Sequence, residues 1–177
     1  MTFKEYLNTY YANRNLSEIS GIQTNNYNKG ESDKLTDLIG IEEFVNLRGL
    51  YVHNNLITDI SPIYNLKHLI YFNCHNNLIS NLSPLSQLTN LTYIDCGVNK
   101  VNDLSPLKNL TKLVNLQCED NDIETIVDIR AIIKNLESFT FRNNPIYGNY
   151  RGLDLDGIIK KLNIDARKLK IEKLFTS

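Results

Sequence analysis

A cysteine and a histidine lie next to each other at Cys74 and His75, within the Asn-rich stretch YFNCHNNLIS. Both residue types bind zinc, and a cysteine beside a histidine can also act as a nucleophile. His53 precedes His75 by 22 residues, and Asp95 follows His75 by 20 residues. One hypothesis is therefore a zinc site formed by His53, His75 and Asp95.

The distribution of the cysteines favours a structural role for them. Cys74, Cys96 and Cys118 recur at intervals of 22 residues, and the sequence contains no C-x-x-C, H-E-x-x-H or G-x-S-x-G pattern. Successive residues of a strand point to opposite faces, so Cys74 and His75 would not share one site. We interpret the three cysteines as a buried column of small apolar side chains. We expect no metal, no cofactor and no catalytic residues.

The interval of 22 residues belongs to an internal repeat. The aligned copies are LRGLYVHNNLITDISPIYNL from Leu47, LIYFNCHNNLISNLSPLSQL from Leu69, LTYIDCGVNKVNDLSPLKNL from Leu91 and LVNLQCEDNDIETIVDIRAI from Leu113. A fifth, partial copy begins at position 136 after one inserted residue, and LTDLIGIEEF at 35–44 is interpreted as a truncated copy before the first. Repeats of this length predict a solenoid, in which each copy buries its apolar side against its neighbours.

Each copy has two halves with different periodicity. The first half alternates apolar and polar residues, which predicts one short, half-buried strand per copy. The second half has an apolar residue at every third position, and Pro62, Pro84 and Pro106 occur there. Proline lacks a backbone N–H and fits where a tight turn or a short 3₁₀ segment begins.

The pattern L-x-x-L-x-(V/C)-x-x-N-x-(I/V) resembles the leucine-rich repeat family, and the ISPI and LSPL segments at 60–63, 82–85 and 104–107 resemble its 22-residue, internalin-like type. The resemblance implies an α/β fold. It would be a right-handed solenoid with short parallel strands on its concave face, 3₁₀ or turn segments on its convex side, and helical caps at both ends.

The ends of the chain are predicted to be these caps, because an open solenoid exposes apolar surface at each end. An N-terminal helix is indicated by the helical spacing of apolar residues at Phe3, Tyr6, Leu7, Tyr10 and Tyr11, and 23–34 has the composition of a loop. Residues 153–175 are predicted to form one or two helices. The predicted boundaries are a helical cap and loop at 1–34, repeats at 35–147 and a helical cap at 148–177.

An asparagine also recurs once per copy, after each predicted strand. We predict a structural role for it, because its amide can pair with backbone groups that the bend leaves without partners. The column consists of Asn55, Asn77, Asn99, Asn121 and Asn144.

The outward strand side chains form the concave face, where partners of leucine-rich repeat proteins usually bind. Tyrosine provides a large contact area with a polar tip and is enriched in interfaces, although it is also a good strand residue. Tyrosines and histidines gather in the first three copies, with acidic residues at one rim. The predicted partner-binding residues are Tyr51, His53, Tyr71, Asn73, His75, Tyr93, Asp95, Gln117, Glu119 and Arg142.

Charge and hydropathy exclude several classes of partner. The chain carries 19 basic and 20 acidic side chains, so no overall field favours nucleic acid or an anionic membrane. No apolar run reaches the roughly 18–20 residues of a membrane span, and the N-terminal residues lack the apolar segment of a secretory signal. We therefore expect a cytoplasmic protein, unless the sequence is a piece of a longer one, and we also expect a monomer.

The resemblance implies a protein–protein interaction module without enzymatic activity. A sharper hypothesis is an inhibitor or immunity-type protein that blocks a basic toxin or enzyme through the concave face. Two alternatives stay open. One is a regulatory subunit of a phosphatase-like enzyme, by analogy with eukaryotic repeats of the same length, and the other is internalin-like adhesion to a host receptor.

Overall fold

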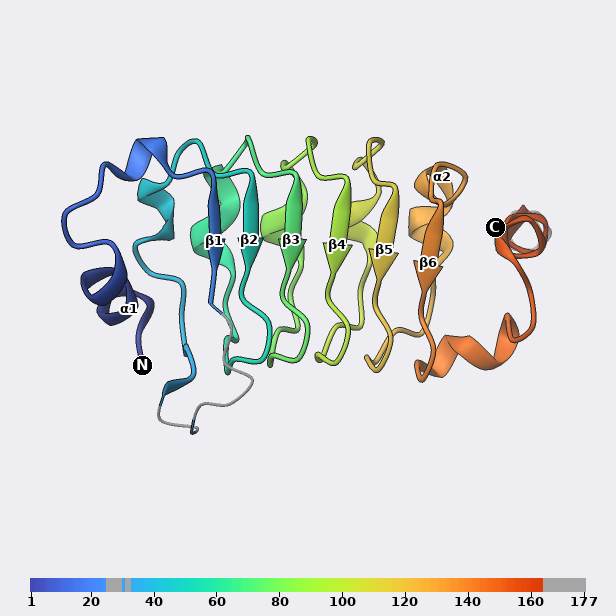
Figure 1. Cartoon of the computed structure of the whole chain (residues 1–177). Coiled ribbons are helices and arrows are strands. Elements are labelled where there is room, and N and C mark those ends of the chain that lie inside the picture. Colours follow the sequence, from blue (N-terminus) through green and yellow to red (C-terminus); the bar gives the residue numbers. More distant parts are fainter. Residues whose placement is uncertain (25–29, 31–32, 164–177) are drawn as a thin grey trace, which may run out of the picture.

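The computed structural model describes residues 1–24, 30 and 33–163. Its main feature is one parallel sheet whose strands follow each other in sequence order (Figure 1). The strands are β1 (Gly21–Gln23), β2 (Gly49–Tyr51), β3 (Tyr71–Asn73), β4 (Tyr93–Asp95), β5 (Asn115–Gln117) and β6 (Ser138–Thr140). Each strand begins one coil of the solenoid, and the predicted fold of the leucine-rich repeat type is confirmed.

The pairing register follows the sequence repeat. Tyr71 of β3 pairs with Tyr93 of β4, and Tyr93 pairs with Asn115 of β5. β5 and β6 keep this register through Asn115 and Ser138, although one residue is inserted between them. The longer coil contains the short helix α2 (Arg130–Ile133), directly after a 3₁₀ segment at Val127–Ile129. The insertion is therefore accommodated on the side of the coil away from the strands.

The convex side consists mainly of 3₁₀ segments, and the repeated prolines lie at the starts of three of them, as the sequence predicts. They span Ser61–Asn65, Ser83–Leu85 and Ser105–Leu107, each with proline in its first turn. An acceptor side chain two residues earlier fixes the start of each segment. The Oδ1 atoms of Asp59, Asn81 and Asp103 accept hydrogen bonds from the backbone N–H groups of the three serines at 2.8, 2.8 and 2.7 Å.

Strand β1 corrects the predicted organisation of the N-terminal part. Residues 21–23 fall within the segment 1–34 that was predicted to be a cap and loop, yet they pair with β2 through Gly21 and Gly49. These partners lie 28 positions apart, whereas the equivalent residues of β2 and β3 lie 22 apart. Because the first coil is longer, a search for the 22-residue repeat does not detect this strand. Residues 25–29 and 31–32 of the predicted loop lie outside the described residues.

Helices flank the sheet at both ends of the described chain (Figure 1). Helix α1 (Phe3–Tyr10) is preceded by its N-cap residue Thr2, whose hydroxyl and Glu5 form a capping box. Its predicted apolar face is confirmed for Phe3 and Tyr6, which are buried, but it is wrong for Tyr10, which is half exposed.

The C-terminal cap is described only in part. Residues 155–163 are helical, as predicted for this part of the segment, and Ile158 and Leu162 are buried. The rest of the predicted helical segment, 164–175, lies outside the described residues. In the part of the chain that the structure describes, no helix is long and apolar enough to cross a bilayer.

The three cysteines lie in one fully buried column. Cys74, Cys96 and Cys118 are free thiols with no exposed surface, and Val52 and Phe141 occupy the same position in the outer coils. Burial, the main cause, raises the pKa of each thiol above its usual value. The predicted apolar role of the cysteines is confirmed.

The asparagine column links each coil to the preceding one. Asn77 is representative, because its Oδ1 accepts a hydrogen bond from the N–H of Ile57 at 3.0 Å and its Nδ2 donates to the carbonyl oxygens of Val52 and Cys74 at 3.0 and 2.9 Å. Ile57 and Val52 belong to the preceding coil, and Cys74 belongs to the coil of Asn77. The same acceptor role recurs at Asn55, Asn99, Asn121 and Asn144. The predicted structural role is confirmed.

The residue before each of these asparagines adopts the left-handed conformation, with φ between 52° and 59°, at Asn54, Asn76, Val98, Asp120 and Asn143. Asparagine and aspartate tolerate this conformation, whereas a β-branched residue rarely adopts it. Their side chains also connect coils, since Asn76 Nδ2 donates to Asn54 Oδ1 and Asn143 Nδ2 donates to Asp120 Oδ1, both at 2.8 Å. Val98 interrupts this column.

Replacing Val98 with asparagine should therefore stabilise the protein. We expect Val98→Asn to raise the free energy of unfolding by about 1 kcal/mol, because it removes a β-branched side chain from a left-handed backbone. Urea denaturation measures the change. Val98→Ala is the matched control and should gain less, because alanine keeps most of the backbone cost. Unchanged or lower stability of Val98→Asn would contradict the argument.

The thiols should be unreactive in the native protein. Ellman's reagent should detect almost no thiol before unfolding and about three afterwards, because the thiolate is the reactive form and burial disfavours it. Cys96→Ser should cost on the order of 1–3 kcal/mol. Cys118→Ser should cost less, because the thiol of Cys118 already donates to the carbonyl oxygen of Thr140 at 3.3 Å. Rapid native modification of Cys96 would show that the column is accessible.

Candidate functional site

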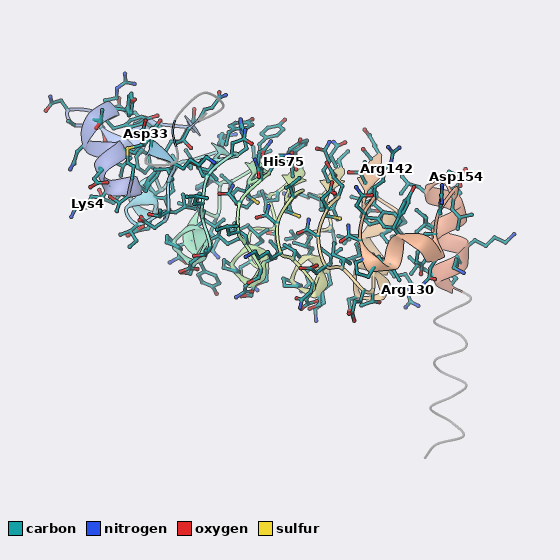
Figure 2. All side chains as sticks on the ribbon, turned by 90° about the horizontal axis from the view of Figure 1, so that it is seen from below. Lys4, Asp33, His75, Arg130, Arg142 and Asp154 are labelled. Carbon is teal, nitrogen blue, oxygen red and sulfur yellow. The ribbon has the colours of Figure 1, made fainter. Side chains whose placement is uncertain are left out.

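A pocket of about 210 Å³ lies on the concave face. Figure 2 shows His75 on the same side of the solenoid as Arg142 and opposite Arg130. All the residues that line the pocket were predicted from the sequence as partner-binding residues. They are His53, Asn73, His75, Asp95, Gln117 and Glu119. The pocket therefore joins side chains from coils that are far apart in the sequence.

Asp95 is the buried acid of this pocket, with only 7% of its surface exposed. Its Oδ1 accepts a hydrogen bond from the N–H of Gly97 at 3.1 Å and lies 3.3 Å from Nδ1 of His75, and its Oδ2 accepts one from Nδ2 of Asn73 at 3.2 Å. Burial raises the pKa of Asp95, while the Gly97 N–H and His75 act in the opposite direction. Asp95, which the sequence predicts at the acidic rim, thus lines the pocket as a buried side chain.

Glu119 approaches the same place from the next coil. Its Oε2 accepts a hydrogen bond from the hydroxyl of Thr140 at 2.7 Å. His75, Asp95 and Glu119 each offer one donor atom to a group whose members lie within 4.8 Å of one another. This group differs from the zinc ligands considered from the sequence, because Glu119 takes the place of His53.

Gly97 and Thr140 shape the site, and neither was among the predicted site residues. A Cβ atom at position 97 would lie 2.9 Å from Nδ1 of His75 and 3.1 Å from Oε1 of Glu119. His75 and Glu119 can therefore approach each other only because position 97 has no side chain. The signal in the sequence was a glycine in a column otherwise occupied by larger residues.

His53 lies at the edge of the pocket. The pKa of His53 is lowered, chiefly by burial and then by repulsion from His75, while Asp95 acts in the opposite direction. His53 is therefore held toward its neutral form, in which one ring nitrogen can accept a hydrogen bond.

The tyrosines form a second feature of the concave face, beside the pocket. Tyr71 is 45% exposed, and its ring centroid lies 6.4 Å from that of Tyr93. The hydroxyl of Tyr93 donates to Oε1 of Gln117 at 3.3 Å, which connects this pair to the pocket. Tyr51 is half-buried and its ring lies over Gly49, since a Cβ there would lie 3.0 Å from the ring. Tyr71 is therefore the most accessible tyrosine of the three.

Arg142 is separate from this group. It is exposed and lines a larger recess of about 570 Å³ near the C-terminal end of the described chain, together with aromatic residues such as Phe139, Phe141 and Tyr150. The structure thus brings together six of the predicted residues in the pocket and a tyrosine pair beside it, but it does not bring Arg142 to them.

Comparison with known proteins supports the assignment of the fold. A family model of leucine-rich repeats in two copies matches residues 45–87 and, overlapping them, 67–109. An internalin from Listeria monocytogenes is similar in structure, with a TM-score of 0.67 and 29% identity over 73% of this chain and 36% of that chain. A leucine-rich repeat protein from Leptospira interrogans gives a TM-score of 0.64 at 25% identity, over 72% of this chain and 32% of that chain.

More distant structures share the fold alone. The ectodomain of a plant membrane receptor kinase from Arabidopsis thaliana is 18% identical, with a TM-score of 0.60 over 72% of this chain and 16% of that chain. No curated protein matches the chain.

The chain has a leucine-rich repeat fold that is similar to that of the internalins. It spans about a third of the length of the Listeria and Leptospira structures. The leucine-rich repeat fold generally serves as a scaffold for protein–protein interactions, because stacked repeats create an extended binding surface.

The geometry of the pocket can be tested through His53. An NMR titration should give this ring a pKa below its ordinary value. His75→Asn should raise the pKa of His53 by removing repulsion, whereas Asp95→Asn should lower it by removing attraction. The titration curve of His68, which lies outside the pocket, is the internal control. Equal titration of His53 in all three proteins would show that these side chains do not lie close together.

Proposed function

We propose that the chain is a non-enzymatic module that binds another protein on its concave face. The observation that carries the proposal is the exposed ring of Tyr71, packed against Tyr93 beside an acidic pocket. Large aromatic side chains held in place by their neighbours are the usual anchors of protein interfaces. The hydrogen bond from Tyr93 to Gln117 restricts one member of the pair before any partner binds.

The chemistry of the pocket favours a basic partner. Asp95 and Glu119 bring two carboxylates to the pocket, and among the residues that the structure describes no lysine or arginine lines it. A lysine or arginine side chain of the partner could enter and pair with these carboxylates, which would also offset the cost of burying Asp95. This complementarity supports the sharper form of the proposal, an inhibitor or immunity-type protein that blocks a basic toxin or enzyme inside the cell.

The three buried thiols are in keeping with a cytoplasmic location, because a reducing compartment keeps such cysteines unpaired. The location is part of the proposal. Regulation of a phosphatase-like enzyme and adhesion to a host receptor are the competing functions, and the identity of the bound protein separates all three.

The test starts from affinity capture of the partner in the cell that produces the chain, followed by titration of variants against the purified partner. Tyr71→Ala and Tyr93→Ala should each weaken binding by about 2 kcal/mol. Tyr71→Ala should change the stability by only about 0.5 kcal/mol, because Tyr71 is a surface residue. Tyr64→Ala is the matched control, because Tyr64 is 47% exposed but lies on the convex side.

A second control separates binding from folding. Phe72 lies between Tyr71 and Asn73 but is fully buried, so Phe72→Ala should cost about 3–5 kcal/mol of stability through a cavity. Glu119→Gln should slow association with a basic partner at low salt, whereas Glu124→Gln, an exposed acid outside the pocket, should not. Wild-type affinity in both tyrosine variants would exclude the concave face as the binding surface.

A further inference from the structure

We propose that the pocket on the concave face is a binding site for one divalent transition-metal ion of the zinc class, held by His75, Asp95 and Glu119. The proposal concerns the chain alone and does not rest on the proposed function, and a bound ion would compete with a partner's basic side chain for the same two carboxylates. It rests on three features of the site, which are the convergence of unlike donor atoms, the space left by Gly97, and the groups that hold the carboxylates.

The donor atoms converge from three different coils. One nitrogen of His75 and one oxygen each from Asp95 and Glu119 lie within 4.8 Å of one another. Donors bound to one zinc ion lie roughly 3–4 Å apart, since each lies about 2.0–2.2 Å from the metal. The 3.3 Å between Nδ1 of His75 and Oδ1 of Asp95 already falls within that range. Small rotations of the Glu119 side chain would complete the group.

Gly97 keeps the centre of this group open. It stands between His75 and Glu119 in the column of residues that follows the strands, and a Cβ there would lie 2.9 Å from Nδ1 of His75. A Cβ would also lie 3.1 Å from Oε1 of Glu119, the oxygen that Thr140 does not bind. The same two donor atoms that would bind the ion therefore border the space that a larger residue would fill.

Neighbouring groups orient the carboxylates. Asn73 and the backbone N–H of Gly97 hold Asp95, and the hydroxyl of Thr140 holds Glu119. Each oxygen keeps a second lone pair for a metal ion. Hydrogen bonds of this kind to ligating carboxylates orient them and contribute to metal affinity in known sites.

The charge of the site also favours a cation. Asp95 is more than nine-tenths buried, and no lysine or arginine lines the pocket within the part of the chain that the structure describes. Two carboxylates with a neutral imidazole would match the charge of a divalent ion. One nitrogen and two oxygen donors suit zinc and its neighbours in the first transition series, whereas calcium requires six to eight oxygens. The remaining coordination positions would face the open side of the pocket.

The test is a titration of the reduced chain with zinc chloride in competition with a chromophoric chelator. We expect one high-affinity zinc ion per chain, and no competition from a large excess of magnesium or calcium. His75→Gln and Glu119→Gln should each weaken binding at least about tenfold, because each removes a ligand. His68→Gln is the matched control, since His68 is exposed and lies outside the pocket, and it should bind as the wild type does.

Two variants test the shape of the site rather than its ligands. Thr140→Val should weaken zinc binding about tenfold by releasing Glu119, although it removes no ligand. Gly97→Ala should abolish high-affinity binding because its methyl group would separate His75 from Glu119. Circular dichroism and thermal melting of each variant establish that it is folded.

A spectroscopic measurement on the wild type does not depend on any variant. Cobalt(II) should broaden the imidazole signals of His75 strongly and leave those of His68 sharp. The proposal is overturned if zinc binding is lost in His68→Gln, or is equal in the wild type, His75→Gln and Gly97→Ala. It is also overturned if the chain binds no zinc, even where a basic partner binds normally, and that result would leave the proposed function intact.

Discussion

The side chain of the asparagine column, which is buried at every position except the half-buried Asn99, is the contact on which the rest of the solenoid depends. At Asn77 this side chain accepts a hydrogen bond from the preceding coil and donates to the backbone of both coils, so these buried peptide groups find partners at a tight bend. The bend also requires a left-handed residue directly before the asparagine. Once this bend is fixed, each coil returns to the same position, and successive strands pair residue for residue.

That register determines which side chains meet on the concave face. Tyr71 and Tyr93 become neighbours because they hold the same position in adjacent coils. His75 and Glu119 hold the same position in coils that are not adjacent, and they approach each other because Gly97, between them, has no side chain. The pocket is thus a gap in an otherwise regular column of side chains.

The sequence is sufficient to predict the solenoid, because 22-residue spacing and strict alternation leave few other folds. It also predicts which residues face outward. It does not predict the burial of Asp95, which depends on the Gly97 N–H and on Asn73 in the neighbouring strand. Nor does it predict that Glu119 replaces His53 beside His75, since column spacing alone favours the adjacent histidine. Strand β1 is missed because its coil has a different length.

The position of the pocket has a mechanical consequence. In a stack of coils that contact mainly their immediate neighbours, each coil contributes a small part of the curvature, and the whole stack can bend. His75 and Glu119 belong to coils on either side of the one that carries Gly97, so bending at that point changes the separation of their donor atoms. Any ligand that binds both His75 and Glu119 would restrict this bending. It would stiffen the middle of the solenoid and leave both ends free to flex.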